Sequence, residues 1–242
     1  MGKKNYFLTI DTETTKTERV ADFAATISDS KGRIATQCAV LIDGVYTDRA
    51  THPLFYDDSS PVDSIWNEQS LDRRYSVYNQ MVKNGTRMLA TVPAIQSWLF
   101  KALATYKPVL TAYNLGFDVD KCAKSGIDLT IFDRRFCLWH ASYSLWGKSK
   151  HYRQFVLDNH AFNPPTALGN MTYKTNAEIM ARFVLGNPSL EDEPHTALED
   201  IVFYELPILN ALLKRRSVKQ LLTDVEPFNW RAIQVKDMFT PS

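Results

Sequence analysis

The segment Phe7-Leu8-Thr9-Ile10-Asp11-Thr12-Glu13-Thr14 combines a short apolar strand with two carboxylates, and the rest of the predicted fold is arranged around it. In an extended chain residues i and i+2 project from the same face, so Asp11 and Glu13 are expected to point together. Two adjacent carboxylates repel each other unless a partner neutralises them, and a divalent cation with oxygen ligands does so. An acidic turn that merely follows a strand would look the same, so the other segments must distinguish the two interpretations.

The composition indicates a soluble globular protein with a substantial core. The chain has 242 residues, 45% of them hydrophobic, and a net charge of +1, so any nucleic-acid contact must come from a local patch. Three cysteines, Cys38, Cys122 and Cys137, are too few for a disulfide framework and favour a reducing compartment. No apolar run approaches the roughly 20 residues that span a membrane, and no signal-peptide pattern is present. We therefore expect a cytoplasmic protein without membrane association.

Hydrophobic periodicity and turn residues predict a mixed α/β domain. Strands are expected at about 5–11, 21–29, 33–42, 108–113 and 131–133, and helices at 66–88, from Thr91 onward, from the Asn114 turn to Ser125, and at 135–147, 151–160, 175–185 and 196–215. An antiparallel hairpin beside parallel strands with helical crossovers is typical of a mixed sheet, here of five strands flanked by helices. One domain over residues 1–223, followed by a C-terminal tail at 224–242, is the predicted organisation.

Further carboxylates occur where such a sheet could gather them. Asp118 begins the helix after the 108–113 strand, and Asp200 lies near the start of the last long helix. Ligands of open α/β sheets collect at strand ends near a topological switch. Four carboxylates would meet there and repel one another without metal: Asp11, Glu13, Asp118 and Asp200. Two bound Mg²⁺ or Mn²⁺ ions would neutralise them and form a two-metal site for phosphodiester hydrolysis.

His195 is the candidate general base, because a neutral imidazole can take a proton from water near pH 7. It precedes Asp200 by five residues, which is about 140° around an ideal helix. Both side chains can reach one point only if His195 lies on the loop ahead of the helix. Pro194 supports a helix entry there.

Three motifs in order carry a resemblance to a known family: Asp11-Thr12-Glu13, Asn114-x-x-Phe117-Asp118 and His195-x-Ala197-x-x-Asp200. They look like the motifs of the DEDDh 3′–5′ exonucleases, which include the proofreading subunit of bacterial replicative polymerase and ribonuclease T. The resemblance spans most of residues 5–213 and implies a ribonuclease H-like fold. A sister group has Tyr four residues before the last Asp, where this chain has Thr196, so the His form is the better match.

The resemblance also implies roles for individual residues. Asp11 would bridge two divalent ions, Glu13, Asp118 and Asp200 would complete the metal ligands, and His195 would be the general base. In that family the backbone of the residue after the first Asp contacts the terminal 3′-hydroxyl, and Thr12 has that position. Substrate contacts are expected from Thr12, Asn114 and Phe117.

The function predicted from these residues is metal-dependent hydrolysis of single-stranded DNA 3′ ends to 5′-mononucleotides. The expected partners are single-stranded 3′ ends, with DNA favoured over RNA. An RNA-trimming 3′–5′ exoribonuclease of the same family and a non-catalytic nucleic-acid-binding module remain alternatives, and the oligomeric state is open.

Two aromatic regions have no assigned role from sequence. Phe136, Trp139, Tyr143 and Trp146 recur at helical spacing, which favours core packing over the stacking of unpaired bases. The tail contains Phe228, Trp230, Ile233 and Phe239, and it could pack on the domain or contact a partner. The stretches 43–90 and 132–173 are longer than the simplest family members need, so substrate choice is left open by both.

Overall fold

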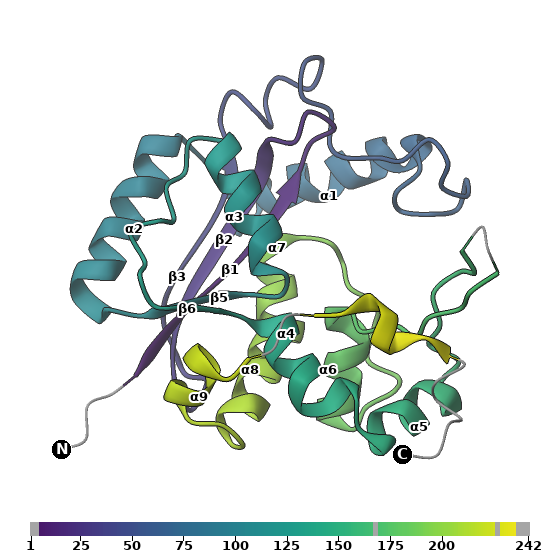
Figure 1. Cartoon of the computed structure of the whole chain (residues 1–242). Coiled ribbons are helices and arrows are strands. Elements are labelled where there is room, and N and C mark those ends of the chain that lie inside the picture. Colours follow the sequence, from purple (N-terminus) through teal and green to yellow (C-terminus); the bar gives the residue numbers. More distant parts are fainter. Residues whose placement is uncertain (1–4, 167–168, 226–227, 236–242) are drawn as a thin grey trace.

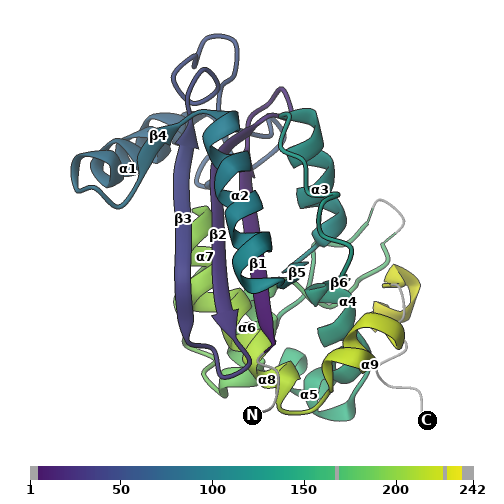
Figure 2. The same cartoon turned by 90° about the vertical axis from the view of Figure 1, so that its left-hand side faces the viewer.

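Six strands form one sheet in the order β4-β3-β2-β1-β5-β6, which helices cover on both faces (Figures 1 and 2). This computed structural model describes residues 5–166, 169–225 and 228–235. The strands are β1 (Tyr6–Thr14), β2 (Val20–Asp29), β3 (Ile34–Ile42), β4 (Met88–Ala90), β5 (Val109–Ala112) and β6 (Arg135–Cys137). β2 is antiparallel to β1 and β3, whereas β1, β5 and β6 run parallel. The predicted mixed α/β sheet flanked by helices is therefore confirmed.

β1 lies inside the sheet and contributes side chains to two hydrophobic cores. Leu8 and Ile10 pack in the core beneath α2 (Val92–Tyr106) and α3 (Leu115–Lys124). Phe7 points to the other core, where the later helices pack. This alternation follows from the two-residue period of a strand, and it places Asp11 and Glu13 together on one face.

The second face is covered by the C-terminal half of the chain (Figure 2). Its elements are α4 (Leu138–Ser142), a π-helical turn η2 (Tyr143–Gly147), α5 (Lys150–Asp158), α6 (Ala177–Leu185), α7 (Ala197–Asp200), a π-helical turn η3 (Ile201–Glu205), α8 (Leu206–Leu213) and α9 (Val218–Thr223). Nearer the β3–β4 edge, the short 3-10 helix η1 (Glu68–Ser70) leads into α1 (Leu71–Lys83), which packs Tyr75 and Tyr78 against Leu41.

The sheet has one strand more than predicted, because residues 66–88 are not a single helix. α1 ends at Lys83, and Asn84 and Gly85 then turn the chain, with a φ of 74° at Gly85. A positive φ is accessible to glycine at little cost, so the helix stops there. Residues Met88–Ala90 then pair in parallel with β3 as β4.

Three other predicted elements differ from the structure. Residues 131–133 lie in an irregular connection, and the strand lies at Arg135–Cys137, where Leu110–Ala112 provide its hydrogen-bonding partners. The helix predicted at 135–147 therefore begins only at Leu138. The helix predicted at 196–215 is divided into α7, η3 and α8 by a π-helical turn.

The described part of the C-terminal tail packs back on the domain. Phe228 lies against Trp139 and Tyr143, with ring centroids 4.1 and 4.9 Å apart. A short 3-10 helix η4 (Trp230–Ile233) follows, and Gln234 forms a β-bridge with Thr172. Residues 236–242, including Phe239, lie outside the described residues. Among the described residues, no helix is both long and apolar enough to cross a membrane.

Candidate active site

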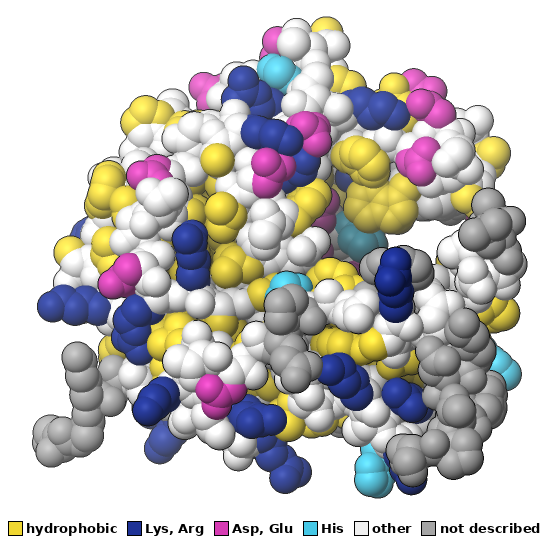
Figure 3. Space-filling view, viewed as in Figure 1, with side chains coloured by type: hydrophobic (Ala, Val, Ile, Leu, Met, Phe, Trp, Pro, Cys, Tyr) yellow, Lys and Arg dark blue, Asp and Glu magenta, His cyan; other side chains and the backbone are white. Residues whose placement is uncertain are grey.

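The carboxylates of β1 lie where one neighbouring strand stops and another continues. β5 pairs with β1 only over Phe7–Thr9, whereas β2 pairs with β1 as far as Thr14. The strand is thus longer than the predicted 5–11, because β2 supports it past the carboxylates. Asp11 and Glu13 are left beside an open edge and line a cavity of about 850 Å³. Figure 3 shows the hollow on this face, with acidic and histidine side chains in its depth.

Asp118 reaches the same cavity from the first turn of α3. Asn114, the residue before this helix, has a φ of 103°, so the chain turns sharply between β5 and α3. The Thr12 hydroxyl donates a hydrogen bond to Asp118 Oδ1 at 2.9 Å, which ties α3 to β1. The carboxylate is almost completely buried.

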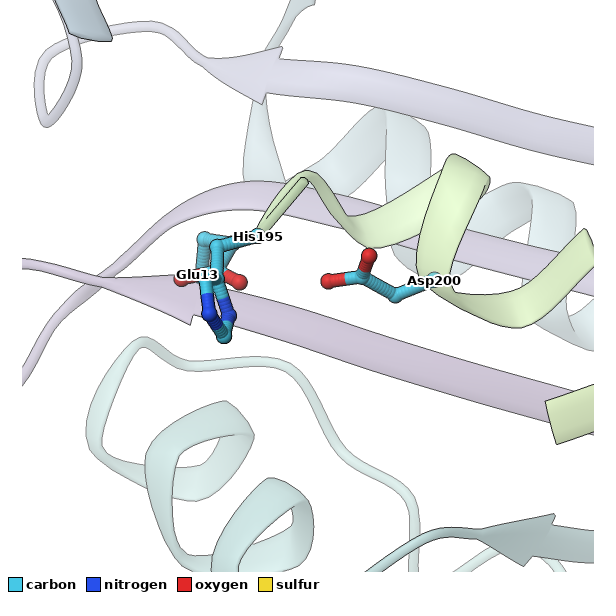
Figure 4. Close-up of side chains that lie close together, drawn as sticks. All are labelled: Glu13, His195 and Asp200. Atoms are coloured by element: carbon cyan, nitrogen blue, oxygen red, sulfur yellow. The ribbon is translucent and has the colours of Figure 1, made fainter. Parts of the chain in front are cut away.

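His195 and Asp200 enter from the opposite side, on the loop before α7 and on α7 itself (Figure 4). His195 has a φ of 54°, and the helix begins two residues later at Ala197. Because His195 lies on this loop and not on the helix, its side chain and that of Asp200 can reach the same point, although positions five residues apart on a helix differ by about 140°. The ligand atoms of Glu13, His195 and Asp200 all lie within 4.8 Å of one another.

All eight residues predicted to form the site line this one cavity: Asp11, Thr12, Glu13, Asn114, Phe117, Asp118, His195 and Asp200. They come from three segments far apart in the sequence. Phe117 is 41% exposed at the rim, and Lys121 Nζ lies 5.2 Å from the centre of its ring.

Three further acidic residues line the cavity and were not predicted from the sequence: Glu18, Glu193 and Glu205. Glu193 lies on the loop before His195, and Glu205 lies five residues after Asp200. In a regular helix the five-residue spacing would turn Glu205 about 140° away from Asp200. The π-helical turn η3 widens this segment, and such turns often occur at functional sites. No sequence pattern signals that turn, so Glu205 was not predictable from spacing.

Burial and mutual repulsion raise the pKa of most carboxyl groups in the cluster. The pKa of Asp11 is raised to about 7, mainly by burial and secondly by repulsion from the negative charge of Asp22. Burial followed by repulsion from Asp11 raises the pKa of Asp200 to about 11 and that of Glu193 to about 8. For Glu13, Asp118 and Glu205 the same two causes raise the pKa well above the usual range of a carboxyl group.

The cluster fits a divalent cation. Asp11 Oδ2, Asp200 Oδ1 and Glu205 Oε2 are buried oxygens without a hydrogen-bond partner among the described residues. Buried polar atoms are normally paired, and unpaired carboxylates are costly. An all-oxygen donor set suits Mg²⁺ or Mn²⁺, and a cation would relieve both the repulsion and the missing partners.

The environment of His195 keeps its imidazole neutral. Burial, followed by the positive charge of Arg74, lowers the pKa of His195 to about 4. The Trp66 ring lies 4.5 Å from the imidazole, centroid to centroid, and the Arg74 guanidinium lies 5.0 Å from the Trp66 ring. Trp66 lies in the long connection between β3 and η1, which also contributes Phe55 and therefore forms one wall of the site.

A buried ionic network holds the start of α7 against the sheet. Asp22 Oδ2 accepts a hydrogen bond from the Ala197 N–H at 3.0 Å, and Arg87 Nε donates to Asp22 Oδ1 at 3.1 Å. Arg87 also pairs with Glu199, whose carboxylate accepts from the Thr196 hydroxyl at 2.8 Å. The Arg87 and Asp22 side chains are fully buried. The network fixes the segment that carries His195 and Asp200.

A scan against protein families finds no match, and a search of the curated proteins finds none either. Among solved structures, a crystal structure of exonuclease I in complex with the inhibitor BCBP is similar to this chain. The two share 15% sequence identity with a TM-score of 0.48. The similarity covers 91% of this chain and 43% of that chain, so this chain spans less than half of that neighbour.

Proposed function

We propose that this protein is a metal-dependent 3′–5′ exonuclease that hydrolyses single-stranded DNA ends to 5′-mononucleotides. The observation that carries the proposal is the convergence of four carboxylates and a histidine, predicted from three separated motifs, on one cavity. Asp11, Glu13, Asp118 and Asp200 would hold two divalent ions of the Mg²⁺ or Mn²⁺ type. Bound ions would neutralise the cluster, lower the pKa of water and stabilise charge on the phosphate.

The residues of this chain would divide the remaining work. His195, neutral at pH 7, would accept the proton of the attacking water as the new P–O bond forms. The bond between phosphorus and the 3′ oxygen of the shortened strand would break, and that oxygen would take a proton from solvent water and leave as the new 3′-hydroxyl. Thr12, Asn114 and Phe117 line the same cavity and would contact the terminal nucleotide.

Removal of single carboxylates tests the site. Asp11→Asn and Asp200→Asn should each reduce Mg²⁺-dependent hydrolysis by roughly 10²-fold or more, because cation stabilisation of the phosphate contributes several kcal/mol. Asp133→Asn, which changes an exposed carboxylate outside the cavity, is the matched control and should keep full activity. Full activity in Asp11→Asn would show that the site is elsewhere.

The products and the sugar preference test the reaction type. Single-stranded DNA and RNA of the same sequence, each labelled at the 5′ end, should shorten progressively from the 3′ end and release mononucleotides, with DNA the faster substrate. Faster trimming of RNA would favour the exoribonuclease alternative, and labelled fragments cut at internal positions, without progressive shortening from the 3′ end, would indicate an endonuclease. Binding of the strands without any cleavage would favour the non-catalytic module.

The role of His195 can be separated from that of the carboxylates. His195→Ala should reduce turnover by roughly 10²–10⁴-fold, the range for a lost general base. Calorimetric titration with Mn²⁺ should give an almost unchanged affinity. Because the imidazole lies within 4.8 Å of Glu13 and Asp200 oxygens, a large loss of Mn²⁺ affinity would instead identify it as a ligand.

A further inference from the structure

A second cavity of about 510 Å³ lies next to the carboxylate cavity. Three residues, Tyr113, Asn114 and Asn176, line both cavities, so the two share a wall. The remaining lining comes from α4, from the segment between α5 and α6, and from the C-terminal tail: Trp139, Asn163, Thr166, Thr172, Thr175, Phe228 and Ile233. None of these seven residues belongs to the carboxylate site.

The aromatic side of this second cavity is held in place by hydrogen bonds at its polar tips. Trp139 Nε1–H donates to Thr175 Oγ1 at 3.0 Å, and the Tyr113 hydroxyl donates to the Thr175 carbonyl. Trp139 is near-parallel to Tyr113 and lies 4.1 Å from Phe228, centroid to centroid. With the polar atoms already paired, the rings present mainly apolar surface to the cavity.

The wall that the two cavities share carries side-chain amides that are free to form hydrogen bonds. The side-chain amides of Asn114 and Asn176 have no partner among the described residues, and both side chains are exposed. Asn163 uses its Nδ2 to bond Thr172 Oγ1 at 2.9 Å, which leaves its carbonyl oxygen as an acceptor. A flat aromatic wall with amides nearby suits the π-face and the polar edge of a nucleobase.

We propose that this second cavity is a nucleobase subsite, which takes a base of the same strand whose 3′ end lies in the carboxylate cavity. The inference rests on the proposed function, because the shared wall makes a continuous path from the phosphodiester to the base. It assigns a use to Phe228, whose role the sequence left open, and to Trp139, for which the sequence favoured core packing. Phe136, on β6, and Tyr143, on η2, are buried and remain core residues.

Phe228→Ala is the main test, with two substrates compared. A single-stranded trinucleotide would reach both cavities, whereas the p-nitrophenyl ester of thymidine 5′-monophosphate would occupy the carboxylate cavity alone. The variant should lower kcat/KM for the trinucleotide roughly 5- to 150-fold, the effect of one lost base–aromatic stack, and leave ester hydrolysis unchanged. Phe100→Ala, which removes a ring 52% exposed on α2, is the matched control. Equal losses on both substrates, or no loss on either, would overturn the proposal.

Abasic substitution locates the base independently of protein folding. Single abasic nucleotides are placed in turn along a short strand, and binding is measured by fluorescence anisotropy with Ca²⁺ in place of Mg²⁺. One position should weaken wild-type binding about as much as Phe228→Ala does, and that abasic strand should bind the variant without further loss. Asn176→Ala, at an exposed position, should weaken the intact strand and leave the abasic strand unaffected. If the abasic strand binds Phe228→Ala more weakly than the intact strand does, so that the two losses of affinity add, the subsite is contradicted.

These measurements also separate the subsite from the proposed reaction. If wild-type protein binds the strand but hydrolyses neither substrate, the exonuclease proposal fails while the abasic comparison still decides the subsite. If wild-type protein binds no strand, both proposals fail.

Discussion

Trp66 and His195 are 129 positions apart in the sequence, yet their rings lie 4.5 Å apart. The Phe55 ring packs on Trp66 in turn, with centroids 5.9 Å apart. Burial is the main reason that the pKa of His195 falls to about 4, and Arg74 adds to it. The Trp66 ring therefore helps to cover the imidazole of the candidate base, whose burial is the main cause of its low pKa.

Trp66→Ala should move the acid limb of the kcat/KM profile to higher pH. The imidazole would lose part of its cover, so its pKa would rise from about 4 toward the ordinary value near 6.5, and more of it would be protonated and inactive at pH 5. A pH–rate series from 4 to 8 on the p-nitrophenyl ester measures the shift. Trp66→Phe should restore most of the wild-type profile, and an unshifted limb in Trp66→Ala would exclude this role.

At the scale of elements, the position of α7 depends on a buried network. Asp22 on β2 accepts from the Ala197 N–H, and Arg87, just before β4, links Asp22 to Glu199. Three elements far apart in the chain are thus joined by one fully buried guanidinium. Removing one partner of a buried pair leaves an uncompensated charge, which typically costs about 3–5 kcal/mol.

Arg87→Met should therefore lower the stability by about 3–5 kcal/mol, or roughly 6–20 °C in melting temperature for a domain of this size. Arg33→Met is the matched control, because Arg33 pairs with Asp29 at 2.6 Å but its side chain is 67% exposed. Surface pairs contribute about 0–1 kcal/mol, so this control should melt almost as the wild type. Thermal unfolding followed by circular dichroism compares them, and equal shifts in both variants would refute a special role for Arg87.

At the scale of the whole molecule, the acidic cavity opposes folding when no cation is bound. An ordinary aspartate in the unfolded chain ionises near pH 3.9, whereas the pKa values of Asp11 and Glu193 in the folded protein are raised to about 7 and 8. Between these values the unfolded state has released protons that the folded state keeps. Raising the pH through this window therefore favours unfolding.

Metal-free protein should accordingly lose melting temperature as the pH rises from about 5 to about 8. Mn²⁺ at 100 times its dissociation constant should raise the melting temperature by roughly 5–10 °C at pH 7.5 and flatten the pH dependence. Asp11→Asn should melt higher than wild type at pH 8 without metal, because it removes one of the repelling charges. Calorimetric scans in chelator and in Mn²⁺ provide the comparison, and a stability that rises with pH in chelator would contradict the charge cluster.

Much of this architecture could be predicted from local patterns. The alternation in Phe7–Thr14, the antiparallel hairpin of β2 and β3 and the Asn114 turn before α3 are encoded in neighbouring residues, and the three motifs pointed to Asp11, Asp118, His195 and Asp200. Short strands were harder, because Met88–Ala90 and Arg135–Cys137 are strands only through the partners that β3 and β5 provide. Periodicity within three residues cannot reveal such a partner.

The sequence by itself determined which side chains could hold a cation and that a mixed sheet would gather them, since residue type and strand period are local properties. Only the tertiary structure decided the rest of the cavity. Glu205 is there because of a π-helical turn, Trp66 because a long loop folds back, and Phe228 because the tail packs on α4. These placements depend on long-range packing and on buried charges that must find partners, and neither is a property of any single segment.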